Sequence, residues 1–124
     1  MAIQIKERHK EGEKIPTRYR SKAQENEVAE EIHGQRQCNS GAQPFKKGDA
    51  YNEQWLIECK TKMVSSESRS IKKSWLEKNK GEALFMGKPY CALAFNFGPD
   101  EENYYIIDRY LFQDLMEYLK QKKE

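Results

Sequence analysis

The chain has 124 residues, 37% of them hydrophobic and 34% charged, and its formal net charge is +2. This length predicts one small domain with a modest core, and the low net charge excludes a global basic field, so any nucleic-acid site must come from local clustering. No apolar run approaches the length of a membrane span, so we expect no membrane partner. Three cysteines, Cys38, Cys59 and Cys91, lack metal-ligand spacing, and no signal peptide is recognisable, which predicts reduced thiols in a cytoplasmic protein.

Residues 1–20 are predicted to form a polar N-terminal arm. Basic and acidic residues are interleaved there without an apolar period, and Pro16 breaks any helix. The arm is either a solvated, partly disordered tail or a basic segment that touches a phosphate backbone. Residues 21–124 are predicted to form a single domain.

The first helix is predicted to begin at Ser21, a candidate N-cap, and to stop at Gly34. Its apolar face carries Val28, Ala29 and Ile32. Glu25 lies on that same side, where an acid is costly without a partner or a metal. Glu25 is therefore a candidate site residue, and the alternative is a helix-end acid that favours the positive helix dipole.

An extended segment from Gln35 to Asn39 leads to the small-residue turn Ser40-Gly41-Ala42, where the backbone can approach a ligand closely. Lys46 and Lys47 stand just before Asp49. Two lysines beside a candidate metal site would attract a polyanion, although a charged solvated loop has the same composition.

A hairpin is predicted around the polar tip Asn52-Glu53-Gln54, followed by a strand from Trp55 to Thr61. Alternation along this strand puts Glu58 and Lys60 on one face, roughly 6–7 Å apart. If the hairpin forms, Asp49 folds back beside Glu58. Two carboxylates and one lysine then converge at one end of a sheet.

This group of side chains has a chemical use. Two carboxylates can hold Mg²⁺, which keeps several of its waters, and the ion activates water and clamps phosphate oxygens. A lysine can orient or deprotonate the attacking water, or hold the phosphate. The alternative interpretation is an edge hairpin whose charges are simply solvated.

The second half of the chain predicts a helix, two strands and a last helix. The helix is capped by Ser68 or Ser70 and runs to about Met86, with Lys72 and Lys73 on its surface. The later elements are a buried strand in Tyr90 to Phe97, a strand from Tyr104 to Asp108, and a helix from Tyr110 to Lys120 with an apolar stripe of Leu111, Leu115, Met116 and Leu119. The order predicts an α/β fold with helices covering a small twisted mixed sheet.

The order Glu25, Ser40-Gly41, Gly48-Asp49 and Glu58-x-Lys60, followed by a lysine-rich helix, resembles the PD-(D/E)xK nuclease superfamily. Within it, the chain is most similar to the archaeal-type and phage-encoded Holliday junction resolvases, over about residues 21–97. The resemblance implies a restriction-endonuclease-like core in which Asp49, Glu58 and Glu25 bind Mg²⁺ or Mn²⁺. It also implies that Lys60 serves catalysis and that Ser40 lies at the site. Glu27 is the alternative first-helix acid, and Gly48 stands where proline is common.

The resemblance leads us to expect a magnesium-dependent, structure-selective endonuclease that cleaves branched DNA such as a four-way junction. We expect a homodimer, in the host cytoplasm if the chain is phage-encoded, with DNA bound by Lys46, Lys47, Lys72 and Lys73. The segments Tyr90 to Phe97 and Tyr110 to Lys120 supply either the dimer interface or ordinary core packing. The alternatives are a restriction or repair nuclease of the same fold and a catalytically silent DNA-binding domain.

Overall fold

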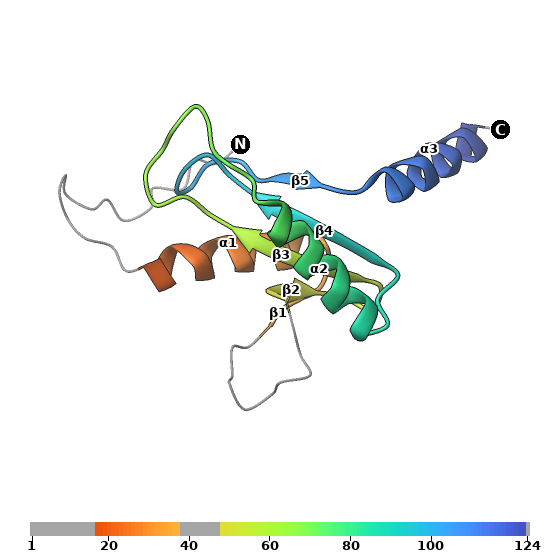
Figure 1. The fold of residues 1–124 in the computed structure, drawn as a ribbon, viewed down its shortest axis with the longest axis horizontal. Helices are drawn as coiled ribbons and strands as arrows, with labels where there is room; N and C mark the ends of the chain where they lie inside the picture. The colour runs from red at the N-terminus through yellow and green to blue at the C-terminus, as the bar shows by residue number, and fades with distance from the viewer. Residues whose placement is uncertain (1–16, 38–47, 124) are drawn as a thin grey trace.

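The computed structural model describes residues 17–37 and 48–123 of the chain. The elements in chain order are α1 (Thr17–Glu31), β1 (Gln35–Arg36), β2 (Ala50–Tyr51), β3 (Trp55–Lys60), α2 (Lys73–Phe85), β4 (Tyr90–Phe95), β5 (Tyr104–Ile106) and α3 (Arg109–Lys123). Figure 1 shows these elements along one chain. The predicted α/β class and the predicted order of elements are both confirmed.

The five strands form one mixed sheet with the order β1-β2-β3-β4-β5. Only β3 and β4 pair in parallel, and the other neighbours are antiparallel. A parallel pair needs a crossover connection, and α2 provides it. As a result β3 and β4 end on the same edge of the sheet, at Lys60 and Phe95.

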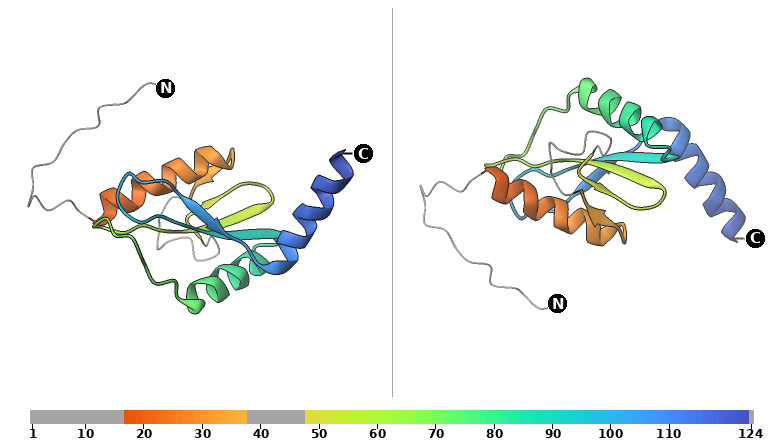
Figure 2. Two further views of the ribbon diagram at one scale, coloured as in Figure 1. Left: turned by 90° about the horizontal axis from the view of Figure 1, so that it is seen from above. Right: turned by 90° about the horizontal axis from the view of Figure 1, so that it is seen from below.

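The helices α1 and α2 cover opposite faces of this sheet (Figure 2). On the α1 face, Val28 and Ala29 pack against Ile57, Ala92 and Ala94. On the other side of the same strands, Leu56 and Leu93 are fully buried, and α2 contributes buried Asn79 and Ala83. The alternation predicted for β3 is therefore confirmed, because Ile57 belongs to the α1 core and Trp55 and Cys59 pack against that core.

The first helix begins at Thr17 and not at Ser21, so residues 17–20 of the predicted arm are helical. Residues 1–16, the rest of that arm, lie outside the described residues. The helix ends at Glu31, and Gly34 closes its C-terminus as predicted, because the N–H of Gly34 donates to the carbonyl of Ala29 at 2.8 Å. A Cβ at Gly34 would collide with the carbonyl oxygen of Tyr51, so glycine allows the helix end to lie close against β2.

Neither Ser68 nor Ser70 caps α2, which begins at Lys73 with Lys72 in the N-cap position and no side-chain cap. Ser66 and Ser68 instead bond to one another in the preceding connector, where the Ser66 hydroxyl donates to the Ser68 carbonyl at 2.8 Å. The helix ends at Phe85, one residue before the predicted end. Ser, Thr and Asp side chains form hydrogen bonds in turns as well as at helix N-caps, which explains why the predicted start of α2 was wrong.

The last helix differs most from its prediction. Asp108 caps α3 by accepting the Leu111 N–H at 2.9 Å, and the helix extends to Lys123. Of the predicted apolar stripe only Leu111 is buried, while Leu115, Met116 and Leu119 are 38%, 47% and 50% exposed. The helix projects away from the sheet (Figures 1 and 2). Core packing therefore does not explain this stripe, whereas Ala92, Leu93 and Ala94 of the Tyr90 to Phe97 run are buried as predicted.

None of the helices that the structure describes is both long enough and apolar enough to cross a membrane.

Candidate active site

The β2–β3 hairpin sets the position of Asp49. Ala50 pairs with Ile57 and Tyr51 with Leu56, and the Asp49 N–H donates to the Ile57 carbonyl at 3.0 Å. The turn is held by Asn52, whose Oδ1 accepts the N–H groups of Gln54 and Trp55, each at 2.8 Å. This is the Asx type of turn, in which a short polar side chain replaces a backbone acceptor. The predicted hairpin exists, and it brings Asp49 beside Glu58.

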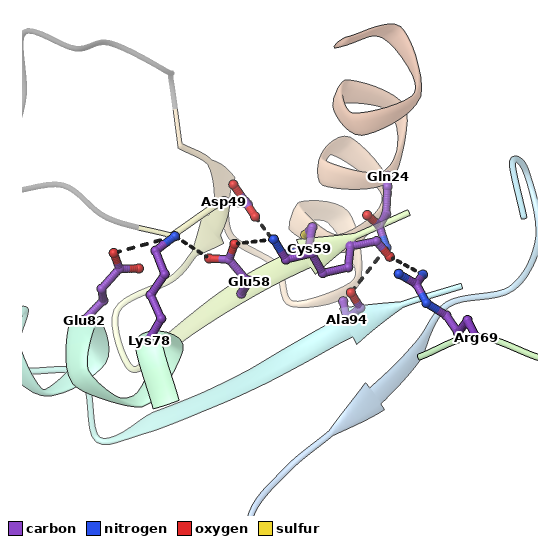
Figure 3. A network of polar contacts seen from close by, with 9 residues as sticks. Gln24, Asp49, Glu58, Cys59, Arg69, Lys78, Glu82 and Ala94 are labelled. Atoms are coloured by element: carbon purple, nitrogen blue, oxygen red, sulfur yellow. Dashed lines mark hydrogen bonds and ion pairs between the residues drawn. The ribbon is translucent and has the colours of Figure 1, made fainter. Parts of the chain in front are cut away.

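The Asp49 carboxylate is fixed by the neighbouring strand. Its Oδ2 accepts the backbone N–H of Cys59 at 2.7 Å (Figure 3). A carboxylate that accepts a backbone N–H is held in one orientation by a charge-assisted hydrogen bond. Asp49 is therefore a pre-positioned anion one residue before β2.

Glu58 is 6% exposed and lies on the α2 side of the sheet. Its Oε2 is 3.6 Å from Lys60 Nζ and its Oε1 is 3.8 Å from Lys78 Nζ. Lys78 Nζ also lies 4.0 Å from Oε2 of Glu82, so Lys78 joins two acids, Glu82 and Glu58 (Figure 3). The ion pair of Glu58 with Lys60 extends this alternation of acids and bases. Burial and the charge of Asp49 raise the pKa of Glu58, and the two lysines act in the opposite direction.

Glu25 joins this group from α1. Its Oε1 lies 3.7 Å from Nη1 of Arg36, which comes from β1. Burial and then the charge of Asp49 raise the pKa of Glu25 to about 7, Arg36 partly offsets this, and Glu58 adds a smaller upward effect. Glu27, the alternative acid, accepts a hydrogen bond from Asn103 at 3.4 Å on the way to β5. Glu25 is therefore electrostatically coupled to Asp49 and Glu58, while Glu27 contacts Asn103.

Gln24, one residue earlier, fixes α1 across the ends of β3 and β4. It is 3% exposed, and its amide nitrogen lies 3.1 Å from the Lys60 carbonyl and 3.4 Å from the Ala94 carbonyl. A buried polar group needs such partners, and here they come from both parallel strands. The register of α1 over the sheet, and with it the position of Glu25, follows from this contact.

Lys60 is half-buried at the end of β3. Besides its ion pair with Glu58, its Nζ lies 4.8 Å from the centre of the Trp75 ring.

Cys59 lies between Glu58 and Lys60 in the sequence, but its side chain faces α1 on the other side of the sheet. Burial, followed by the charges of Asp49, Glu25 and Glu58, raises the pKa of its thiol far above the usual range, so this thiol stays protonated.

The donor set fits magnesium in chemical type. Asp49, Glu58 and Glu25 supply hard oxygen atoms, and each of the two glutamates has its pKa raised by the charge of Asp49. Three carboxylates grouped in this way favour a divalent cation, although Arg36, Lys60 and Lys78 already offset part of their charge. Within residues 17–37 and 48–123, however, no three Asp, Glu, His or Cys side chains are close enough to hold a metal ion together. Two carboxylates and several waters remain a sufficient shell for Mg²⁺.

Two residues of this site could not be found from sequence. Lys78 reaches Glu58 only because α2 packs across β3, and Arg36 reaches Glu25 only because β1 pairs beside β2. The only local signal for Lys78 is its helical i,i+4 spacing to Glu82, which any surface pair would give.

The remaining predicted residues fall into two groups. Ser40, Lys46 and Lys47 lie outside the described residues. Lys72 and Lys73 stand at the start of α2, both exposed, and Lys72 Nζ lies 5.9 Å from the Trp75 ring. Cys59 and Cys91 are free thiols, and Cys38 is not among the described residues.

Gly48 has a positive φ of 80°, and a Cβ there would collide with the side chain of Leu56. Only glycine adopts this conformation at low cost. Proline, with φ fixed near −65°, is excluded from this position.

No family model matches the chain, and neither a curated protein nor a solved structure matches it significantly.

Proposed function

We propose that the protein is a metal-dependent DNA endonuclease of the PD-(D/E)xK type that acts on branched DNA, a Holliday junction resolvase. The observation that supports the proposal is the hairpin that aligns Asp49, Glu58 and Lys60, with Glu25 electrostatically coupled to the two acids. A solvated edge hairpin would not bury Glu58 against two lysines beside a second and third carboxylate.

Each side chain has a role in phosphodiester hydrolysis. Asp49 and Glu58 hold Mg²⁺ or Mn²⁺, and Glu25 completes the negative charge around the ion. When bound, the ion lowers the pKa of a water and offsets the charge that develops on the phosphate. Lys60, which lies between Glu58 and Trp75, either orients or deprotonates the attacking water, or holds the phosphate as a point charge.

A homodimer suits this substrate, because two symmetric cuts in a four-way junction require two sites related by a twofold axis. The exposed stripe of α3 supports an interface between copies. Beside the base of α3 lies a hollow of about 370 Å³ lined mainly by apolar side chains, namely Ile32, Trp55, Ile57, Ala92, Tyr105, Ile107 and Leu115. An isolated helix of this length has marginal stability in water. Burial of the α3 stripe in the hollow of the partner would therefore stabilise the helix and the dimer together.

Incubation of labelled four-way junction, linear duplex, flap and single strand with Mg²⁺ or EDTA tests the function. We expect junction cleavage in Mg²⁺ only, loss of cleavage in Asp49→Asn, and parent-like cleavage in the control Asp114→Asn on exposed α3. Preference for linear duplex would favour a restriction or repair nuclease. Tight binding of DNA without cleavage of any substrate would favour the catalytically silent domain.

A further inference from the structure

Three cations, one from the end of β3 and two from the connector that follows it, gather around one indole. Trp75, in the first turn of α2, has Lys60 Nζ at 4.8 Å, the Arg69 guanidinium carbon at 5.8 Å and Lys72 Nζ at 5.9 Å from its ring centre. Cations at these distances are attracted to the face of an aromatic ring. We call Lys60, Arg69, Lys72 and Trp75, with Lys62 and Lys73 beside them in sequence, the Trp75 surface.

The connector that carries these cations is strongly basic, although the whole chain is nearly neutral. Residues 60–73 contain the acid Glu67 and the bases Lys60, Lys62, Arg69, Lys72 and Lys73. Lys72 and Lys73 also stand at the N-terminal end of α2, where the helix dipole disfavours positive charge. The free protein therefore carries a repulsive cost that an anion would remove.

Arg69 is held in place by neutral acceptors. Its Nη1 donates to the carbonyl of Lys60 at 3.2 Å and to the carbonyl of Asn96 at 2.7 Å. Lys60 is the last residue of β3, and Asn96 directly follows the last residue of β4. The side chain of Asn96 also accepts the Lys62 N–H at 3.1 Å. These bonds fix the connector to the sheet and leave the charge of the guanidinium without a carboxylate partner in this contact.

The Trp75 surface is continuous with the candidate active site. Lys60 belongs to both, since its ammonium contacts Glu58 on one side and Trp75 on the other. Ligands of open α/β sheets commonly bind outside the carboxyl ends of parallel strands, which is where Arg69 lies. A chain of phosphates that crosses the Trp75 surface would thus continue to Glu58.

We propose that the Trp75 surface binds the sugar–phosphate backbone of a nucleic acid and leads the strand to Glu58, an inference that rests on the proposed nuclease function. Trp75 serves as a neutral platform that keeps the cations together without neutralising them. Phosphate contacts of this kind release counterions, so they make binding depend steeply on salt. They are independent of sequence, as a structure-selective enzyme requires.

The test measures DNA binding without cleavage, in Asp49→Asn protein with EDTA. One triple variant combines Lys62→Gln, Lys72→Gln and Lys73→Gln, and the matched control combines Lys120→Gln, Lys122→Gln and Lys123→Gln on α3. Each phosphate contact contributes about 0.9 to the slope of log K against log salt on duplex DNA, so we expect the first triple to lower the slope by about 2 to 3 and the control to leave it unchanged. Equal slopes in the two triples would overturn the proposal.

A second measurement reports on Trp75 itself. The chain has two tryptophans, so Trp55→Phe leaves Trp75 as the only indole emitter. We expect duplex DNA and single-stranded DNA to change the Trp75 emission at the concentrations at which they bind. An emission that DNA at saturation leaves unchanged would overturn the inference.

The two proposals fail separately. Protein that cuts no DNA, but loses DNA binding only in the Lys62, Lys72 and Lys73 triple, would remove the nuclease proposal and retain the surface. Protein that cuts junctions while both triples bind DNA alike would retain the nuclease and remove the surface.

Discussion

Lys78 Nζ lies 3.8 Å from Oε1 of Glu58, although the two residues belong to different elements on facing layers. The ammonium is largely exposed while the carboxylate is buried, so the pair joins a solvated cation to a desolvated anion. Lys78 is therefore a cation that already lies beside one oxygen of a proposed metal ligand. In this arrangement the lysine neutralises part of the charge that the candidate metal site needs.

Lys78→Met should therefore strengthen binding of Mn²⁺ to the free protein. The effect should be modest, about two- to fivefold, because an exposed ammonium is screened by solvent. Calorimetric titration with Mn²⁺ measures it, with Lys120→Met on α3 as the control for loss of one positive charge. Unchanged or weaker binding of Mn²⁺ by Lys78→Met would show that the lysine does not compete for Glu58.

Asp49→Asn should lower cleavage by a factor of at least about 10² while the protein remains folded. The asparagine oxygen can still accept the Cys59 N–H, which Asp49 accepts at 2.7 Å, but it supplies no negative charge to a metal ion. Single-turnover cleavage of a labelled junction and far-UV circular dichroism separate activity from folding. Parent-like cleavage by this variant would mean that Asp49 is not a ligand.

The raised pKa of Glu25 predicts a pH dependence of stability in metal-free protein. Its pKa is about 7 in the folded protein, against an ordinary value of 4.5, so the unfolded chain releases this proton at lower pH. The free energy of unfolding should therefore fall as pH rises from about 4.5 to 7, by about 1–2 kcal/mol after allowance for solvent screening, and then level off.

Glu25→Gln should remove this contribution and make the variant relatively more stable above pH 7. Urea unfolding at a series of pH values measures the difference, and Glu30→Gln, an exposed position of the same helix, is the control. If the free energy of unfolding depended on pH in the same way in Glu25→Gln and in the parent protein, Glu25 would not be the source of this pH dependence.

Leu115→Lys should dissociate the proposed dimer, because it places a charge in the exposed stripe of α3 and in the apolar hollow that Leu115 borders. Gln113→Lys, on the polar side of the same helix, is the matched control and should leave the dimer intact. Light scattering over a range of concentrations gives the molar mass of each. A parent protein that is monomeric at all concentrations would contradict the pairing of α3 with the hollow.

Local patterns were sufficient to predict β3 and the hairpin. Alternation from Trp55 to Lys60 is a property of the strand itself, and it correctly placed Glu58 and Lys60 on one face. The polar tip at Asn52 predicted the turn for the same reason, since the Asn52 side chain bonds to its own neighbours in the chain. Both features depend on interactions between residues that are close in the sequence, so the sequence alone was enough to predict them.

Features that depend on packing could not be predicted in the same way. Lys78 and Arg36 meet the acids only through the arrangement of α2 and β1 around the hairpin. The serines before α2 favoured an early helix start, but Arg69 ties this segment to the ends of β3 and β4 in an irregular connector. The helical period of α3 predicted the helix correctly, and it contained no information on whether the stripe is covered.

Gly48 limits how this chain can change over evolution. Its φ of 80° and its closeness to Leu56 mean that the backbone enters Asp49 along a path that proline cannot follow. Any side chain at this position would require the backbone that enters Asp49 to change or Leu56 to move. The position of Asp49 is thus tied to the absence of a side chain one residue earlier.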